Sequence, residues 1–72
     1  MGRLSNISGK EAVKVFAKFD YVLDNQTGSH MILWHESRLT LSVLNHRELA
    51  PGLLRSLIRQ AGMTVDEFLT NR

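Results

Sequence analysis

The central sheet is predicted from residues 30–43, which read HMILWHESRLTLSV. Residues 39–43 alternate apolar and polar side chains with the period of two that a half-buried strand requires. Residues 30–35 contain a tryptophan and neither glycine nor proline, which predicts a second strand, although their apolar run hides which face is buried. Only Glu36 and Ser37 separate the two segments, so a tight antiparallel hairpin is expected, although these are not preferred turn residues. The residues of the alternating strand expected in the core are Leu39, Leu41 and Val43.

A third strand and a first helix are predicted before this hairpin. Residues 21–23 favour β structure, and the polar residues 24–29 that follow have the composition of a loop. Ser8 and Glu11 have the spacing of a capping box, in which each side chain bonds the backbone amide of the other residue. Apolar side chains then recur at helical spacing, which predicts a helix over residues 9–19.

Two further helices are predicted after the hairpin. Pro51 opens the first of them, at a position where proline is well tolerated, and Gly62 is a natural end for it. The apolar residues between them again follow helical spacing. Thr64 and Glu67 form a second capping box, which starts a short helix that ends near Leu69.

The order of these elements defines an α+β fold, α-β-β-β-α with a short additional helix at the C-terminal end. A three-stranded sheet must bury one face, so both main helices are expected on one face of an antiparallel sheet. The opposite face is left open to solvent or to a partner. No repeat or linker interrupts the sequence, and residues 1–72 are expected to form a single domain.

The composition excludes several classes of function. The 72 residues contain no cysteine, which removes disulfides, thiol nucleophiles and zinc–thiolate sites. The longest apolar run is residues 31–34, and residues 1–6 lack the apolar stretch of a signal peptide, so no membrane partner and a cytoplasmic location are expected. The net charge of +2 is compatible with a polyanionic partner but does not require one.

His30 is the candidate for catalytic chemistry. It follows Gly28 and Ser29 at the mouth of a strand, where the backbone amides of a turn can approach an anion. Imidazole titrates near neutral pH and can transfer protons during phosphodiester cleavage, for which RNA supplies its own nucleophile, the 2′-hydroxyl. A single histidine at a strand end is more often a surface residue, so the residues alone leave both interpretations open.

The other histidines and the tryptophan have simpler interpretations. His35 lies an odd number of residues from His30, which places the two side chains on opposite faces of a strand. His46 is expected in a solvated loop, so neither a metal site nor a cofactor is predicted. Trp34 is interpreted as a core residue, with a stacking surface for a base as the alternative if it faces the open side of the sheet.

Three stretches are informative when taken together. They are SGKE at residues 8–11, GSH at residues 28–30, and NHRELAPG at residues 45–52, which continues as LRSLIRQAG at residues 54–62. In order and spacing they resemble the HicA (YcfA-like) toxin family over nearly the whole chain. The resemblance implies a fold similar to a double-stranded RNA-binding domain, which agrees with the element order predicted above.

The resemblance also implies an activity and two partners. It implies a type II toxin that is a metal-independent mRNA interferase, an endoribonuclease that cleaves mRNA, with the catalytic histidine of the family at His30. It further implies that the toxin is held inactive by a HicB-type antitoxin protein. The expected partners are therefore an mRNA substrate and a HicB-type antitoxin.

The RNA-binding residues are expected around the turn and on nearby basic side chains. Basic residues that commonly precede Gly-Ser-His in the family are replaced here by Asn25 and Thr27. Charge stabilisation must therefore come from cations elsewhere in the fold. The residues expected to contact RNA are Gly28, Ser29, Lys10, Lys14 and Arg38.

Three alternative functions belong to other classes. A non-catalytic RNA-binding module of the same fold would rely on shape and phosphate contacts alone. A DNA-binding helix-turn-helix within residues 53–69 is disfavoured, because its last helix carries Asp66 and Glu67 and no base-reading arginine or lysine. An interaction protein that offers the open sheet face to a partner is also compatible with the sequence.

Overall fold

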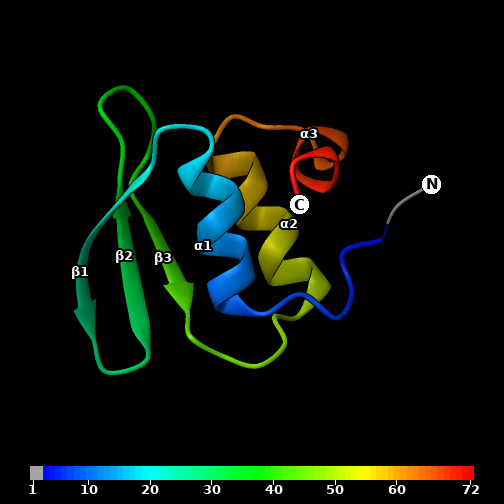
Figure 1. The fold of residues 1–72 in the computed structure, drawn as a ribbon, viewed down its shortest axis with the longest axis horizontal. Coiled ribbons are helices and arrows are strands. Elements are labelled where there is room, and N and C mark those ends of the chain that lie inside the picture. The colour runs from blue at the N-terminus through cyan, green and yellow to red at the C-terminus, as the bar shows by residue number, and fades with distance from the viewer. Residues whose placement is uncertain (1–2) are drawn as a thin grey trace.

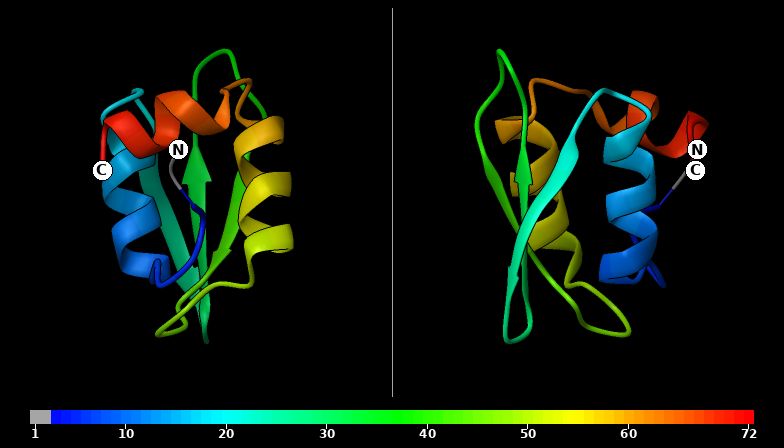
Figure 2. Two further views of the ribbon diagram at one scale, coloured as in Figure 1. Left: turned by 90° about the vertical axis from the view of Figure 1, so that its right-hand side faces the viewer. Right: turned by 60° about the vertical axis from the view of Figure 1, so that its left-hand side comes forward.

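The computed structural model describes residues 3–72 and confirms the predicted order of elements. These are α1 (Gly9–Ala17), β1 (Val22–Thr27), β2 (His30–Trp34), β3 (Leu41–Leu44), α2 (Pro51–Gln60) and α3 (Val65–Thr70). The three strands form one antiparallel sheet, and α1 and α2 cover one of its faces (Figure 1). The short helix α3 lies across the helical layer on the side away from the sheet (Figure 2).

The strands follow one another in the order β1-β2-β3, and a two-residue turn joins the first two. In this turn Gly28 has a φ of +57° and the φ of Ser29 is not positive, which is the combination of signs in a type II′ hairpin turn. The predicted loop over residues 24–29 is therefore wrong, because residues 24–27 continue β1. Every residue of this edge strand is exposed, which explains why its polar composition resembles that of a loop.

The connection between β2 and β3 is longer than the predicted two-residue hairpin. Residues 35–40 form it, and β3 begins only at Leu41. Leu39 lies in this connection with a side chain that is 63% exposed, so its predicted place in the core is wrong. The Leu39 carbonyl accepts a hydrogen bond of 2.7 Å from the Tyr21 hydroxyl, which fixes the backbone here while the side chain points to solvent. Leu41 and Val43 are fully buried, as the alternating pattern predicts.

Helix α1 begins at the predicted cap and packs tightly on the end of β3. The Ser8 hydroxyl accepts a hydrogen bond of 3.0 Å from the amide of Glu11. Gly9 follows the cap, is buried, and donates its amide to the carbonyl of His46 at 2.9 Å. A Cβ atom at Gly9 would lie 1.9 Å from the carbonyl oxygen of Leu44. The approach of α1 to β3 therefore requires glycine at this position.

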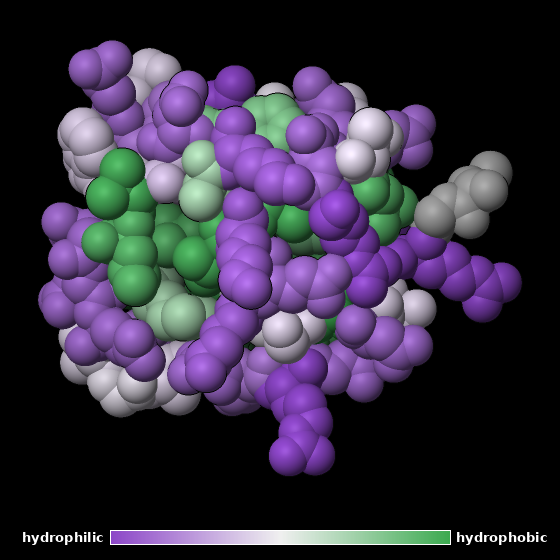
Figure 3. Space-filling view, in the orientation of Figure 1, coloured by the Kyte–Doolittle hydropathy of each residue, from purple (hydrophilic) through white to green (hydrophobic). Residues whose placement is uncertain are grey.

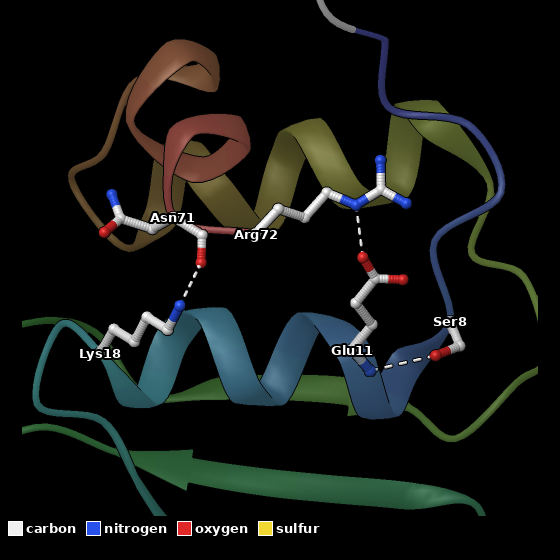
Figure 4. Close-up of polar contacts among 5 residues, drawn as sticks. All are labelled: Ser8, Glu11, Lys18, Asn71 and Arg72. Atoms are coloured by element: carbon white, nitrogen blue, oxygen red, sulfur yellow. Dashed lines mark hydrogen bonds and ion pairs between the residues drawn. The ribbon is translucent and has the colours of Figure 1, made fainter.

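The C-terminal end of the chain is fastened to α1 (Figure 4). The Lys18 ammonium group donates to the carbonyl of Asn71 at 2.9 Å, and Arg72 forms an ion pair with Glu11. The Glu11 carboxylate faces Arg72 in this arrangement, so only the Ser8 half of the first predicted capping box is found in the described part of the chain. The second predicted box, between Thr64 and Glu67 at the start of α3, is complete.

The core lies between the sheet and the helical layer. The ring of Phe16 on α1 is 5.4 Å from the ring of Phe68 on α3 and 5.8 Å from that of Tyr21, measured between centroids. The strand β1 contributes little to this core, because it is exposed along its whole length. Figure 3 shows hydrophobic surface on the strand side of the molecule, and further hydrophobic areas between hydrophilic side chains over the rest of this view. The largest fully buried side chains are Phe16, Phe68, Ile7, Leu33, Leu41, Leu49, Leu54 and Ile58.

Candidate functional site

One face of the sheet has no helix packed on it (Figure 2). Along β2 the side chains of Met31 and Leu33 are buried beneath the helices, so His30, Ile32 and Trp34 lie on the opposite, open face. The Trp34 side chain is 50% exposed there. The interpretation of Trp34 as a core residue is therefore wrong, and the reason is the apolar run of β2, which contains no alternation to show its orientation.

His30 lies at the start of β2 with an exposed side chain. Its Nδ1 atom is 3.2 Å from the hydroxyl oxygen of Ser42, which lies on the neighbouring strand β3 between two buried residues. The register places Ser42 opposite Ile32, which lies two residues after His30 on β2. The side chains of Ser42 and His30 therefore share the open face. This contact leaves the Nε2 atom of His30 as the nitrogen available to a ligand.

The turn before His30 is tied to the chain that leaves β3. The amide of Asn45 donates to the carbonyl of Ser29 at 2.6 Å, directly beyond the pair formed by His30 and Leu44. Gly28 has open space around the position of a Cβ atom, so its glycine serves the positive φ rather than a close contact. The expected residues Gly28, Ser29 and His30 are thus adjacent in one fixed turn.

The expected basic residues do not converge on His30. Lys10 and Lys14 are exposed on α1, which packs on the other face of the sheet from the His30 side chain. Lys10 lies in the first turn of α1, close along the chain to Gly9, whose amide bonds the loop after β3. Arg47 is an exposed cation in that same loop, and it is not among the residues that the sequence predicts to contact RNA.

Arg38 lies beyond the opposite end of β2 from His30. Its guanidinium donates to the carbonyl of Ala61 at the end of α2, at 2.7 Å. Arg38 also lines a surface depression between residues 36–39 and residues 60–62. The depression is therefore remote from the His30 turn, and the hydrogen bond of Arg38 to Ala61 is a structural one.

His35 has a different role from His30, and its position on the opposite side of the sheet is confirmed. Its Nε2 atom is 2.9 Å from the carbonyl oxygen of Phe19, at the end of α1. Its Nδ1 atom accepts hydrogen bonds from the amides of Ser37 and Arg38 at 3.0 and 3.1 Å. An acceptor Nδ1 and a donor Nε2 define one neutral tautomer. His35 therefore holds the β2–β3 connection against α1.

Residues 3–72 contain neither a cluster of metal-ligating side chains nor a helix of membrane-spanning character. No group of three or more histidine, cysteine, aspartate or glutamate side chains is close enough to hold a metal ion within this range. None of the helices described for these residues has the length and apolar character needed to span a bilayer.

A comparison with known protein families identifies the family to which the chain belongs. The family described as HicA toxin of bacterial toxin–antitoxin matches residues 9–63, which is more than half of the chain. The chain belongs to the HicA toxin family. It is accordingly a toxin of a toxin–antitoxin system, and such a system includes an antitoxin partner. No curated protein and no solved structure matches the chain.

The HicA match includes most of the fold and all of the candidate site. It begins at Gly9, the glycine that contacts β3, and ends at Met63, directly before the cap of α3. His30 and Ser42 lie within the matched range. The short helix α3 and its contacts to α1 lie outside it.

Of the open-face residues, Ser42 is not predicted as part of a site, and Trp34 is predicted there only as the alternative to a core position. Ser42 could have been suggested by its outward position in the alternating strand, but its contact with His30 depends on the pairing register of β2 and β3. Trp34 was assigned to the core. Its orientation follows from that of His30, since both lie at even spacing on β2.

Proposed function

We propose that this HicA toxin is a metal-independent endoribonuclease that cleaves mRNA, with His30 as the proton-transfer group. The observation that carries the proposal is the exposed imidazole of His30, which is held by Ser42 on a sheet face that no helix covers. A histidine fixed through Nδ1 presents Nε2 in a constant direction. This is the arrangement that general acid–base catalysis requires.

The reaction needs no nucleophile from the protein. The Nε2 atom of His30 takes the proton of a ribose 2′-hydroxyl, whose oxygen attacks the adjacent phosphorus. The bond from phosphorus to the 5′-oxygen of the next nucleotide breaks, and the imidazolium returns the proton to that oxygen. The products are a 2′,3′-cyclic phosphate and a 5′-hydroxyl end. One positioned histidine contributes about 10²- to 10⁴-fold to such a step.

The phosphate at His30 is proposed to be held by the backbone of the turn, while basic side chains farther away contact other phosphates of the RNA. Gly28 and Ser29 offer the backbone of the hairpin turn directly beside His30. Lys10 and Lys14 are proposed to contact more distant phosphates of the RNA, because they lie on the helical side of the sheet. Arg38 would contribute at the other end of β2, in addition to its bond to Ala61. Removing any one of these cations should make the negative slope of log affinity against log salt shallower by about 0.7 for single-stranded RNA.

The first prediction tests His30 with purified protein and single-stranded RNA. We expect His30→Ala to lower the cleavage rate by about 10²- to 10⁴-fold, because proton transfer at both oxygens is lost. Ser42→Ala should lower the rate less, since it removes only the partner of Nδ1. The measurement is the initial rate of cleavage, with thermal unfolding of each variant recorded in parallel.

His46→Ala is the matched control, because it removes another exposed histidine that has no part in the proposed chemistry. A DNA strand of the same sequence should resist cleavage, since it lacks the 2′-hydroxyl. Undiminished cleavage by His30→Ala would refute the mechanism. If the unaltered protein binds RNA without cutting it, the chain is instead a non-catalytic RNA-binding module.

The proposed partner is a HicB-type antitoxin, and the proposed location is the cytoplasm, where mRNA is translated. Val22 and Trp34 are exposed apolar side chains on the open face, and they give such a protein a surface to cover. Co-expression of the neighbouring reading frame should relieve any growth arrest that the toxin causes. A neighbouring gene product that neither binds nor protects would contradict this assignment.

A further inference from the structure

The open face of the sheet carries an apolar patch beside His30. Trp34 is 50% exposed and its cross-strand partner Val22 is 57% exposed. Ile32 is half-buried and lies between Trp34 and His30 on the same face of β2. Isolated exposed apolar residues are common on protein surfaces. Here they form a continuous row that ends at the candidate catalytic histidine.

The spacing of this row suits a polynucleotide. His30 and Trp34 are four residues apart on one strand, which corresponds to about 13 Å at the usual rise of about 3.3 Å per residue. Exposed aromatic side chains on RNA-binding sheets stack two or three bases. A strand of RNA that lies along β2 can therefore place a phosphate at His30 and a nearby base on the ring of Trp34.

The chemistry around the row also matches a nucleobase, which has a flat apolar face and a polar edge. Three uncharged hydrogen-bonding side chains share the open face: Asn25 opposite Ile32, Thr27 opposite His30, and Ser42. These three side chains are uncharged, and the one carboxylate of β1 is the exposed Asp24 at the register shift beside Asn25. A base within a duplex has both faces covered by its neighbours, so only an unpaired base can stack here.

We propose that Trp34 is a base-stacking subsite, and that the RNA substrate of this toxin is therefore single-stranded where it crosses the open face of the sheet. This inference rests on the proposed ribonuclease function and adds the substrate class and a residue that selects it. Trp34 binds the substrate through a neighbouring base and takes no part in proton transfer.

The tryptophan itself reports on the proposal, because the chain contains only one. The probe is a short mixed-sequence oligoribonucleotide with 2′-O-methyl groups, which cannot be cleaved, and binding is measured independently by anisotropy of a label on the RNA. We expect tryptophan fluorescence to be quenched in parallel with the anisotropy. The same RNA annealed to its complement should quench much less. Binding of the single strand without any change in Trp34 fluorescence would overturn the proposal.

Substitutions test the energetic contribution. Trp34→Ala should weaken binding of the single strand and raise the KM for cleavage by about 5- to 150-fold, the range for removal of one stacked base. The kcat should change little, since His30 and Ser42 remain in place. Trp34→Phe should recover much of the affinity. Leu39→Ala is the matched control, because it removes an exposed apolar side chain from the loop beyond the sheet.

The outcomes separate this inference from the proposed function. Loss of cleavage in His30→Ala together with an unchanged KM in Trp34→Ala would leave the ribonuclease intact and overturn the stacking subsite. A Trp34 side chain whose fluorescence responds to the antitoxin but not to RNA would also overturn it, and would make this face a protein interface. Cleavage of single- and double-stranded RNA at equal rates would contradict the substrate class.

Discussion

Gly9 occupies the point where the first turn of α1 meets the backbone of β3. Because a Cβ atom there would lie 1.9 Å from the carbonyl oxygen of Leu44, Gly9→Ala must push helix and strand apart. We expect this substitution to lower the free energy of unfolding by about 1–3 kcal/mol, the usual cost of overpacking. For a chain of this size the melting temperature should fall by roughly 4–8 °C for each kcal/mol, which calorimetry can measure.

Gly52 provides the control for this prediction. It lies in the first turn of α2, and a Cβ atom there would meet nothing within 4 Å. Gly52→Ala should therefore be neutral or stabilise the protein by up to about 1 kcal/mol through helix propensity. Equal melting temperatures for the two alanine variants would show that the helix and strand can separate without cost.

The sequence predicted the roles of some single residues better than those of others. His30 was identified because the Gly-Ser-His motif carries the family resemblance, and its exposure agrees with a site. Gly9 also lies in a motif that carries the resemblance. Glycine is needed there because the backbone of Leu44 lies close to it, and this tertiary contact is not visible in the sequence. The contact with Ser42 and the exposure of Trp34 depend on strand register and on which face of β2 is buried. Neither is encoded in a run of apolar residues.

Among the elements, the connection between β2 and β3 is the one most dependent on side-chain hydrogen bonds. His35 bonds it to the end of α1, and Arg38 bonds it to the end of α2. The Tyr21 hydroxyl donates to the carbonyl of Leu39 within it. Together these bonds hold a six-residue connection, 35–40, between the same two strands for which a two-residue turn was predicted.

The Tyr21 bond gives this element a pH dependence. Burial raises the pKa of Tyr21 above its ordinary value, and the nearby Arg38 opposes this only in part. A group whose pKa is raised in the folded state stabilises the fold below its unfolded pKa, and that contribution is lost as the pH rises through the folded pKa. We therefore expect the free energy of unfolding to fall above about pH 10, the ordinary pKa of tyrosine.

Tyr21→Phe isolates this effect, because lysines also titrate in the same range. At neutral pH the substitution should cost about 1 kcal/mol, the net value of the hydrogen bond to Leu39. Above about pH 10 the difference between the two proteins should shrink, since only the unaltered one loses stability through Tyr21. Urea denaturation from neutral to alkaline pH provides the measurement. A difference that stays constant over the whole range would contradict the assignment.

Element boundaries were predictable where a local chemical signal marks them. The Ser8 and Thr64 caps and Pro51 at the start of α2 are such signals, and all three are confirmed. The edge strand β1 has no comparable signal, because its polar half is exposed on both faces and its register shifts between Leu23 and Asn25. Its pairing with β2, rather than any pattern of its own, makes it a strand.

For the molecule as a whole, the helix α3 completes a core that would otherwise be small. A chain of 72 residues without disulfides has a stability of roughly 4–11 kcal/mol at typical values per residue. The helix α3 lies outside the matched family range, yet it buries Phe68 completely against Phe16. Its polar links to α1 are the ion pair of Arg72 with Glu11 and the bond from Lys18 to Asn71.

The buried ring of Phe68 and the ion pair of Arg72 with Glu11 should differ strongly in their contribution to stability. We expect Phe68→Ala to cost about 3–5 kcal/mol, since it removes a large buried ring and leaves a cavity. Arg72→Ala should cost less than about 1 kcal/mol, because the side chains of the ion pair are 36% and 35% exposed and solvent screens them. Chemical denaturation of both variants gives the comparison, and equal decreases in stability would show that the ion pair, rather than the ring, holds α3.

Binding of the antitoxin should raise the free energy of unfolding of the toxin by mass action. A partner that binds only the folded toxin stabilises it by about 4 kcal/mol at a free concentration 1,000 times its Kd. The destabilised Phe68→Ala variant should therefore accumulate as folded protein when the antitoxin is co-expressed, and be degraded when it is absent. Gly9→Ala should behave in the same way, because its defect also lies within the core rather than on the open face. If neither variant is rescued although the antitoxin still binds the unaltered toxin, the antitoxin must recognise the helical layer itself.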